Sequence, residues 1–482
     1  MNPLPALQYL GRLTLLVAVA QLAPLVCGLV YGESRSTRAF LISLAVTGLV
    51  GAGLAFGIRT REVVYRREGL LIVVGGWVLA SVFGALPYVL SGTLPNPIDA
   101  LFESASGFTT TGATVLIDIG AADRAILFWR SFTQWLGGMG IIVLFVALLP
   151  EVGPGARFLY RLEVPGPKAE ALQPRVHETA VILWRLYLGF TLVETVLLRL
   201  AGMNLYDALT HTFSTMSTGG FSPRNESVAA FDSPLVHIVI IVFMVIAGTN
   251  FSLFFGLREK RSFAFFRDAE FRFYIFILTA TSILVTVVLL LEETYTEPLR
   301  ALLDGTFQVV SILTTTGFGT ADFELWPVFL QAILVMLMFV GGCAGSTAGS
   351  MKIMRMFIGV KAALREVRHL FSPNTVTRIF VGDRPVPNSV ANTVAGFFIL
   401  YLTTWAIGAV LLSIGSPDLV TSVTASAATI GNIGPGLGAV GPTDNFAFWS
   451  GGHKVLMVVL MLAGRLEMYS FAALITRSFW KH

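Results

Sequence analysis

The sequence predicts an all-α polytopic membrane protein, with four parallel helix–pore-loop–helix repeats around a central pore and two N-terminal transmembrane helices before them. Three observations support this fold class. The 482 residues are 55% hydrophobic and only 13% charged, whereas a soluble domain is about 25% charged. Apolar runs such as 13–30, 41–58 and 275–291 can each cross a bilayer core of about 30 Å as a helix. A short run of hydroxyl residues and glycine also returns four times.

Basic residues orient the chain in the bilayer. They cluster in 59–68, 151–178, 258–272 and 352–384, and again at the C-terminal end. Positively charged loops stay in the cytoplasm, so both termini should be cytoplasmic and the four polar runs should lie on the outer side.

The same clusters divide the chain into units. We expect an N-terminal helix pair at 1–68, then repeats at 69–150, 151–258, 259–360 and 361–482, the second and the fourth carrying a cytoplasmic linker. Every repeat enters from the cytoplasm. The repeats are therefore parallel, unlike the inverted repeats found in many transporters.

Each repeat should contain a short helix that ends inside the membrane. Candidate caps and first-turn residues for these helices are Asn96 with Pro97 and Asp99, Asn204 with Asp207, Thr296 or Asp304, and Ser416 with Pro417 and Asp418. A helix of about 12 residues spans only about 18 Å, so it would enter from outside and stop near mid-membrane. Its C-terminal end carries partial negative charge, which favours a cation.

The polar runs "TTTGA", "MSTGG", "TTTGF" and "ATIGN" follow these short helices. Aligned on one glycine each, they give the candidate filter residues Thr110, Thr111 and Gly112; Ser217, Thr218 and Gly219; Thr315, Thr316 and Gly317; and Thr429, Ile430 and Gly431. Extended backbone there would aim carbonyl oxygens at a monovalent cation. A divalent ion would need carboxylates, which the runs lack. The alternative is close helix packing through small residues, but four copies behind four short helices favour a pore.

These repeats and the runs "SGFTTTGAT", "FSTMSTGGFSP", "TTTGFGT" and "ATIGNIGPG" resemble the Trk/Ktr/HKT superfamily of potassium transporters, in particular its bacterial TrkH branch. The resemblance implies K⁺ as the transported ion, with Rb⁺ also accepted, in the bacterial cytoplasmic (inner) membrane. It implies a homodimer with one pore per protomer and a cytosolic, nucleotide-binding TrkA ring that opens the pore. Relatives that pass Na⁺ have serine in the first loop, so Gly112 argues for K⁺.

A glycine-rich run, "GGCAGSTAGS" at 341–350, interrupts the last helix of the third repeat. Glycine disfavours helix, so the run is either a close-packing patch or a helix break that lines the pore. The resemblance implies a gate below the filter. The candidate gate residues are Gly341, Gly342, Gly345, Ser346, Gly349, Lys352 and Arg465.

Arginines within apolar segments need a cavity or a partner. Arg465 is expected in mid-helix, where it either faces the pore or pairs with Glu467. Arg130, nearer a helix end, is expected to extend its side chain to the membrane surface.

Three function classes follow from these features. The first is a gated, K⁺-selective uptake pore. The second is a symporter that moves K⁺ with H⁺ or Na⁺ through the same filter. The third is a membrane-embedded enzyme, which would need a nucleophile–base pair or metal cluster that the sequence does not display. We expect no enzyme activity, no organic cofactor and no nucleic-acid partner.

Overall fold

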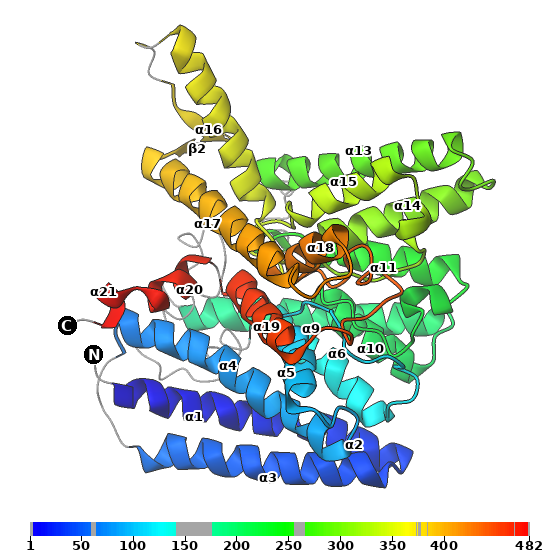
Figure 1. Ribbon diagram of the computed structural model, residues 1–482, viewed down its shortest axis with the longest axis vertical. Helices are drawn as coiled ribbons and strands as arrows, with labels where there is room; N and C mark the ends of the chain where they lie inside the picture. The colour runs from blue at the N-terminus through cyan, green and yellow to red at the C-terminus, as the bar shows by residue number, and fades with distance from the viewer. Residues whose placement is uncertain are drawn as a thin grey trace.

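The computed structural model describes residues 3–58, 64–140, 176–254, 266–372, 374, 377–382, 384–466 and 468–480. The described chain is mostly helical, and its two ends lie on the same side of the molecule (Figure 1). Within these residues, six helical segments are long and apolar enough to cross a membrane, or seven if a bent pair counts as one span. Residues 59–63, 141–175 and 255–265, which include much of the predicted basic loops, lie outside the described residues.

The N-terminal pair consists of α1 (Pro3–Ala20) with α2 (Leu22–Tyr31), followed by α3 (Ser34–Gly57). Helices α1 and α2 together form one candidate span, with a break at Gln21. A Cβ added at Gly11 would collide with the backbone of Ala55, so the absence of a side chain lets α1 and α3 approach closely.

Four units follow, each with a long helix, a short helix and a second apolar helix. They are α4 (Arg66–Ser91), α5 (Pro97–Phe108) and α6 (Arg124–Gly138); α9 (Val176–Leu200), α10 (Leu205–Met216) and α11 (Pro234–Ala247); α13 (Ala269–Leu291), α14 (Pro298–Leu313), α15 (Val328–Met338) and α16 (Ile353–Phe371); and α17 (Asn388–Leu412), α18 (Leu419–Ile430), α19 (Gly451–Arg465) and α20 (Met468–Ile475). Each short helix packs against the long helix of its own unit: α5 against α4, α10 against α9, α14 against α13 and α18 against α17.

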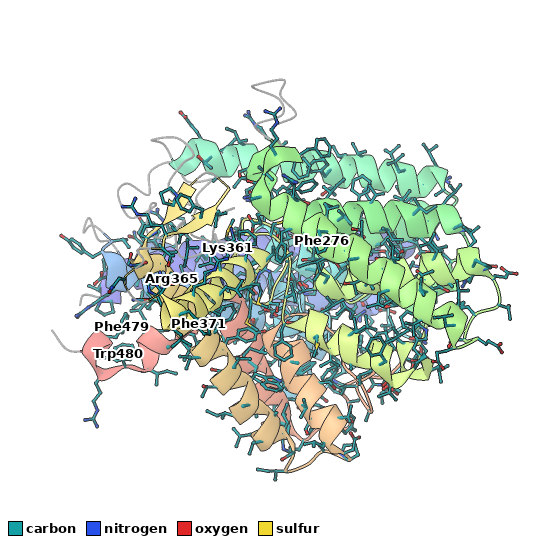
Figure 2. All side chains as sticks on the ribbon, turned by 90° about the horizontal axis from the view of Figure 1, so that it is seen from above. Phe276, Lys361, Arg365, Phe371, Phe479 and Trp480 are labelled. Atoms are coloured by element: carbon teal, nitrogen blue, oxygen red, sulfur yellow. The ribbon has the colours of Figure 1, made fainter. Side chains whose placement is uncertain are left out.

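The remaining elements are small. They are η2 (Ser227–Ala230), η4 (Phe323–Leu325), β1 (Ile379–Val381), β2 (Arg384–Val386) and α21 (Arg477–Trp480). Strands β1 and β2 pair antiparallel, with Phe380 opposite Pro385. They follow α16, which extends away from the helical body and continues past residue 360 (Figure 1). Figure 2 shows Lys361, Arg365 and Phe371 along this helix.

Asparagine side chains start the first two short helices, as predicted. The side chain of Asn96 accepts a hydrogen bond from the amide of Ile98 at 3.0 Å, and Asn204 accepts one from the amide of Asp207 at 2.9 Å. Each bond satisfies an amide that the helix itself leaves unpaired.

The predicted starts of the other two short helices are wrong. The cap of α18 is Asp418, whose carboxylate accepts from the amide of Thr421 at 2.8 Å, so Ser416 lies outside the helix. Helix α14 begins at Pro298, whose fixed backbone angle suits a first turn, and the preceding Glu297 makes no side-chain cap. Thr296 and Asp304 are therefore not its caps.

The second helices of units three and four are interrupted. Helix α15 ends at Met338 and α16 begins at Ile353, so 339–352 form the predicted break. Helix α19 ends at Arg465, and the prediction that this arginine lies in mid-helix is wrong. Glu467, its suggested partner, lies outside the described residues.

Candidate functional site

The backbone after each short helix adopts one conformation four times. The angle φ is +56° and +81° at Thr110 and Gly112, +54° and +76° at Thr218 and Gly220, +58° and +82° at Thr315 and Gly317, and +53° and +105° at Asn432 and Gly434. In each loop the two left-handed residues are the second and fourth after the helix. The equivalent glycines are therefore Gly112, Gly220, Gly317 and Gly434.

Backbone hydrogen bonds confirm this register. The residue before each of these glycines donates a hydrogen bond from its amide to a carbonyl in the last turn of the preceding short helix. The pairs are Thr111 with Ser106, Gly219 with Ser214 and Thr316 with Ser311, each at 2.8 Å, and Ile433 with Ala428 at 2.9 Å. Gly219 and Ile433 thus occupy the place of Thr111 and Thr316.

The predicted alignment is wrong in the second and fourth loops. In the second loop the predicted residues Ser217, Thr218 and Gly219 lie one position too early in the sequence. In the fourth loop the predicted residues Thr429, Ile430 and Gly431 lie three positions too early. Thr429 and Ile430 are the last residues of α18, and Gly431 is its C-cap. The second run contains two adjacent glycines and the fourth has another glycine at Gly434, so residue type alone favoured the wrong one.

The four loops close into a ring. A Cβ at Gly112 would collide with the carbonyl oxygen of Gly219, one at Gly220 with that of Thr316, one at Gly317 with that of Ile433, and one at Gly434 would lie 2.9 Å from that of Thr111. Each glycine therefore faces the loop of the next unit, and the fourth faces the first. Both the left-handed backbone and the lack of space require glycine at these positions.

The ring has the donor set of a monovalent cation site. Along each loop, residues with positive φ alternate with residues whose φ is not positive. The carbonyl oxygens of Thr111, Gly219, Thr316 and Ile433 each lie against the glycine of another loop. Four helix C-termini also converge here with partial negative charge. Among the described residues, no group of three His, Cys, Asp or Glu could hold a metal ion. Carbonyl oxygens without carboxylates suit a partly dehydrated K⁺ or Na⁺ better than a divalent ion.

A pocket of about 110 Å³ lies against the glycine side of the ring. Its lining includes Gly112, Gly220, Gly317 and Gly434, together with Arg130, Arg224, Asn225 and Asp444. All four loops therefore reach the same opening, which supports the corrected register.

A buried ion pair braces the first two loops, and sequence reasoning missed it. Arg130 on α6 contacts Glu103 on α5 at 2.7 Å, and their side chains are 1% and 0% exposed. The guanidinium also donates to Thr114 Oγ1 and to the carbonyl of Ser222, both at 3.1 Å. Arg130 therefore does not extend to the membrane surface as predicted. The signal available was the acidic residue within the otherwise uncharged segment "LFESASGF".

Two amide side chains also hold the ring. Gln134 donates to the carbonyl of Gly219 at 2.6 Å and accepts from the amide of Phe221 at 3.0 Å. Asn432, which replaces the threonine of the other loops, donates to Thr111 Oγ1 at 2.9 Å and links the fourth loop to the first. These contacts fix the spacing between neighbouring loops.

The break between α15 and α16 contacts the helix-end side of the ring. Thr347 Oγ1 donates to the carbonyl of Met216 at 3.1 Å, and the amide of Gly349 donates to Thr315 Oγ1 at 2.7 Å. The amide of Ser350 donates to the carbonyl of Gly431 at 3.0 Å. The segment thus touches the ends of three short helices, whereas the pocket lies against the glycines.

Left-handed residues shape this segment. Gly341 and Gly345 have φ of +76° and +75°, and Lys352 has φ of +67°. Lys352 is 4% exposed, and its ammonium donates to the carbonyls of Ala348 and Ser346. The amide of Ile353 donates to the carbonyl of Gly342 at 3.0 Å, which closes the segment at its base.

Arg465 ties the segment to the first unit. Its guanidinium donates to the carbonyl of Thr347 at 2.9 Å, and to those of Gly137 and Gly138 at 2.6 and 2.8 Å. Three carbonyl acceptors from two units hold this cation. The structure therefore brings together all the predicted gate residues on one side of the ring.

Comparison with known proteins gives the family. The family model TrkH, described as a cation transport protein, matches residues 36–480. The chain belongs to the TrkH family. It is 40% identical to the Trk system potassium uptake protein TrkH of Salmonella typhimurium, over 98% of each chain, and 39% identical to that of Escherichia coli K12, again over 98% of each. The crystal structure of the potassium transporter TrkH from Vibrio parahaemolyticus matches with a TM-score of 0.90 and 37% identity, over 100% of both chains.

The TrkH membership predicted from the four runs is thereby confirmed, and so is the all-α polytopic membrane class.

In this TrkH-family chain, Glu324 joins the connecting loops of units three and four. Its carboxylate accepts a hydrogen bond from the amide of Gly438. Burial raises the pKa of Glu324, the bond from Gly438 opposes this, and the nearby carboxylates Asp322, Asp444 and Asp418 raise it further. This contact is therefore sensitive to pH.

Proposed function

We propose that the protein carries K⁺ into a bacterial cell across the cytoplasmic membrane, through a gated, K⁺-selective pore that also passes Rb⁺. The observation that carries the proposal is the closed ring of four loops, each presenting carbonyl oxygens behind an indispensable glycine. The names of the relatives, potassium uptake proteins and a potassium transporter, support the same ion.

K⁺ would bind to backbone carbonyls of the ring. With the corrected register, the filter segments are 110–112, 218–220, 315–317 and 432–434. Arg130, Glu103, Gln134 and Asn432 keep the loops at their spacing. A rigid ring can replace the hydration shell of K⁺ more completely than that of the smaller Na⁺.

The segment 341–352 and Arg465 would form the gate. The segment contacts the helix-end side of the ring, so an ion that leaves the ring on this side would meet it. The positive charges of Lys352 within the segment and of Arg465 beside it would oppose a cation there. The family resemblance adds a homodimer, cytoplasmic termini and a TrkA-type regulatory ring. The basic residues of α16, such as Lys361 and Arg365, offer that partner a docking surface.

The test is ion flux into liposomes that contain the purified protein, with K⁺, Rb⁺ or Na⁺ and with the regulatory ring added or withheld. We expect Rb⁺ uptake that K⁺ inhibits more strongly than Na⁺ does. A reversal potential that follows K⁺ alone supports a pore, whereas dependence on H⁺ or Na⁺ gradients indicates the symporter. Deletion of several residues within 341–350 should give high flux that no longer responds to the ring. A folded deletion variant that stays closed would remove this segment from the gate.

A further inference from the structure

The first turn of α13 contacts the interrupted segment through a buried carboxylate. Glu270 is 2% exposed, and its Oε1 accepts a hydrogen bond from the amide of Ala344 at 2.7 Å. Asp268 caps the same turn, accepting from the amides of Glu270 and Phe271 at 3.0 and 3.1 Å. The cap holds the turn rigid, and the partial positive charge of the helix start favours the negative carboxylate.

Ala344 lies in the part of the segment that is held away from the ring. The neighbouring amide of Cys343 donates to the carbonyl of Gly248 at 2.8 Å, and the carbonyl of Gly345 accepts from the amide of Phe251 at 3.1 Å. The later residues, from Thr347 to Ser350, are the ones that touch the short helices. The segment therefore has an anchored half, 343–345, and a ring-contacting half, 347–350.

Helix α13 also contacts the helix that follows the segment. The rings of Phe273 on α13 and Phe357 on α16 lie 5.2 Å apart. Ala269 packs in the same small apolar cluster as Ala344 and Ile358. The start of α13 thus touches both the anchored half of the segment and α16, so any shift between the two helices reaches Ala344 directly.

We propose that Glu270 is a positioning residue that latches the segment in its ring-blocking conformation. This rests on the proposed function, because it assumes that the segment 341–352 is the gate. A hydrogen bond to an ionised acceptor is stronger than one between neutral groups, and its strength depends steeply on distance and angle. Movement of α16 relative to α13 breaks the bond and frees the anchored half.

The chain carries its own reporter of this movement. It has two cysteines, Cys27 and Cys343, and Cys343 is buried beside Ala344. In a Cys27→Ser background, a water-soluble thiol reagent added to the reconstituted protein measures how often the anchored half opens. Rb⁺ influx into the same liposomes measures conduction separately.

Three substitutions test the latch. Glu270→Leu removes the acceptor at similar size, Glu270→Asp keeps the charge but is too short to reach Ala344, and Glu270→Gln keeps an acceptor in place. We expect Glu270→Leu and Glu270→Asp to raise the labelling rate of Cys343 about tenfold or more, equivalent to about 1.4 kcal/mol, and to increase Rb⁺ influx. The labelling rate and the influx of Glu270→Gln should stay close to those of the Cys27→Ser parent. The matched control is Glu68→Leu, because Glu68 is also in the first turn of its unit's long helix and is 6% exposed.

The outcomes separate the latch from the gate. Unchanged labelling in folded Glu270→Leu overturns the latch, and if that variant does not fold, unchanged labelling in Glu270→Asp does the same. Faster labelling of Cys343 without increased Rb⁺ influx would support Glu270 as the residue that holds the segment in place. It would also show that the segment is not the gate, and so contradict that part of the proposed function. Equal effects from Glu68→Leu would show a general loss of stability and would also overturn the latch.

Discussion

Gly112 of the first loop faces the carbonyl oxygen of Gly219 in the second so closely that no side chain fits between them. In the same way, the glycine of the second loop faces a carbonyl oxygen of the third, and the glycine of the third faces one of the fourth. The glycine of the fourth loop faces a carbonyl oxygen of the first with slightly more space, which closes the ring. The ring thus depends on residues without side chains as much as on its carbonyl groups.

The first prediction concerns Gly112. Gly112→Ser should lower the preference for K⁺ over Na⁺ more than it lowers the yield of folded protein. A left-handed serine costs about 1–3 kcal/mol, and its side chain would push the carbonyl of Gly219 out of place. Competition of K⁺ and Na⁺ for Rb⁺ uptake measures this preference. An unchanged ratio would remove Gly112 from the filter.

The corrected register predicts different outcomes at two glycines of the fourth loop. Gly434 has φ of +105°, whereas Gly431 has a right-handed helical conformation that alanine accepts. Gly434→Ala should therefore impair ion selectivity strongly. Gly431→Ala should do so less, although its Cβ would lie 2.8 Å from both the Ala427 carbonyl oxygen and the Ile433 side chain, so that both would have to shift. Ion competition in liposomes compares the two. The reverse order would restore the alignment on Gly431.

The buried pair of Glu103 and Arg130 should matter for stability. Replacing Arg130 with Met leaves a carboxylate buried without its cation, which costs about 3–5 kcal/mol in typical buried pairs. We expect a lower thermal midpoint in detergent and reduced flux. The double variant Glu103→Gln with Arg130→Met should recover part of the loss. If the single and double variants unfold alike, the charge pair is not what braces the loops.

Arg465 should restrain conduction. Arg465→Ala removes a positive charge and three hydrogen bonds, including the one to Thr347 in the segment that we propose as the gate. Rb⁺ influx without the regulatory ring should therefore rise. Thermal unfolding of the same preparation is the control. Reduced influx together with lost stability would instead assign Arg465 a purely structural role.

Glu324 predicts a pH effect on stability. Its pKa is raised in the folded protein, chiefly by burial. When the pKa of a carboxyl group is higher in the folded than in the unfolded protein, the protonated group favours the folded state. This contribution to stability is full at a pH below the unfolded pKa and is lost as the pH rises through the folded pKa. Glu324→Gln should therefore stabilise the protein increasingly as the pH rises from acid to neutral. Thermal midpoints of both proteins across this range measure the effect, and parallel pH curves would contradict it.

Much of the fold followed from local sequence because local physics determines it. Apolar runs give long helices, and Asn96 and Asn204 cap the next helix from within one turn. The register of the loops did not follow, because it depends on which residue turns left-handed, and Thr218 and Asn432 do so without being glycine. Contacts between distant residues, such as Arg130 with Glu103 or Glu270 with Ala344, arise only when the units pack together.

Because one polypeptide supplies all four quadrants, a mutation in the gene alters a single quadrant and leaves three intact. In a channel of four identical subunits, every such mutation alters all four quadrants at once. Here the quadrants have already diverged, with asparagine at one of the four equivalent positions and threonine at the other three. On the proposed function, heritable change can thus adjust the balance between ions one quadrant at a time.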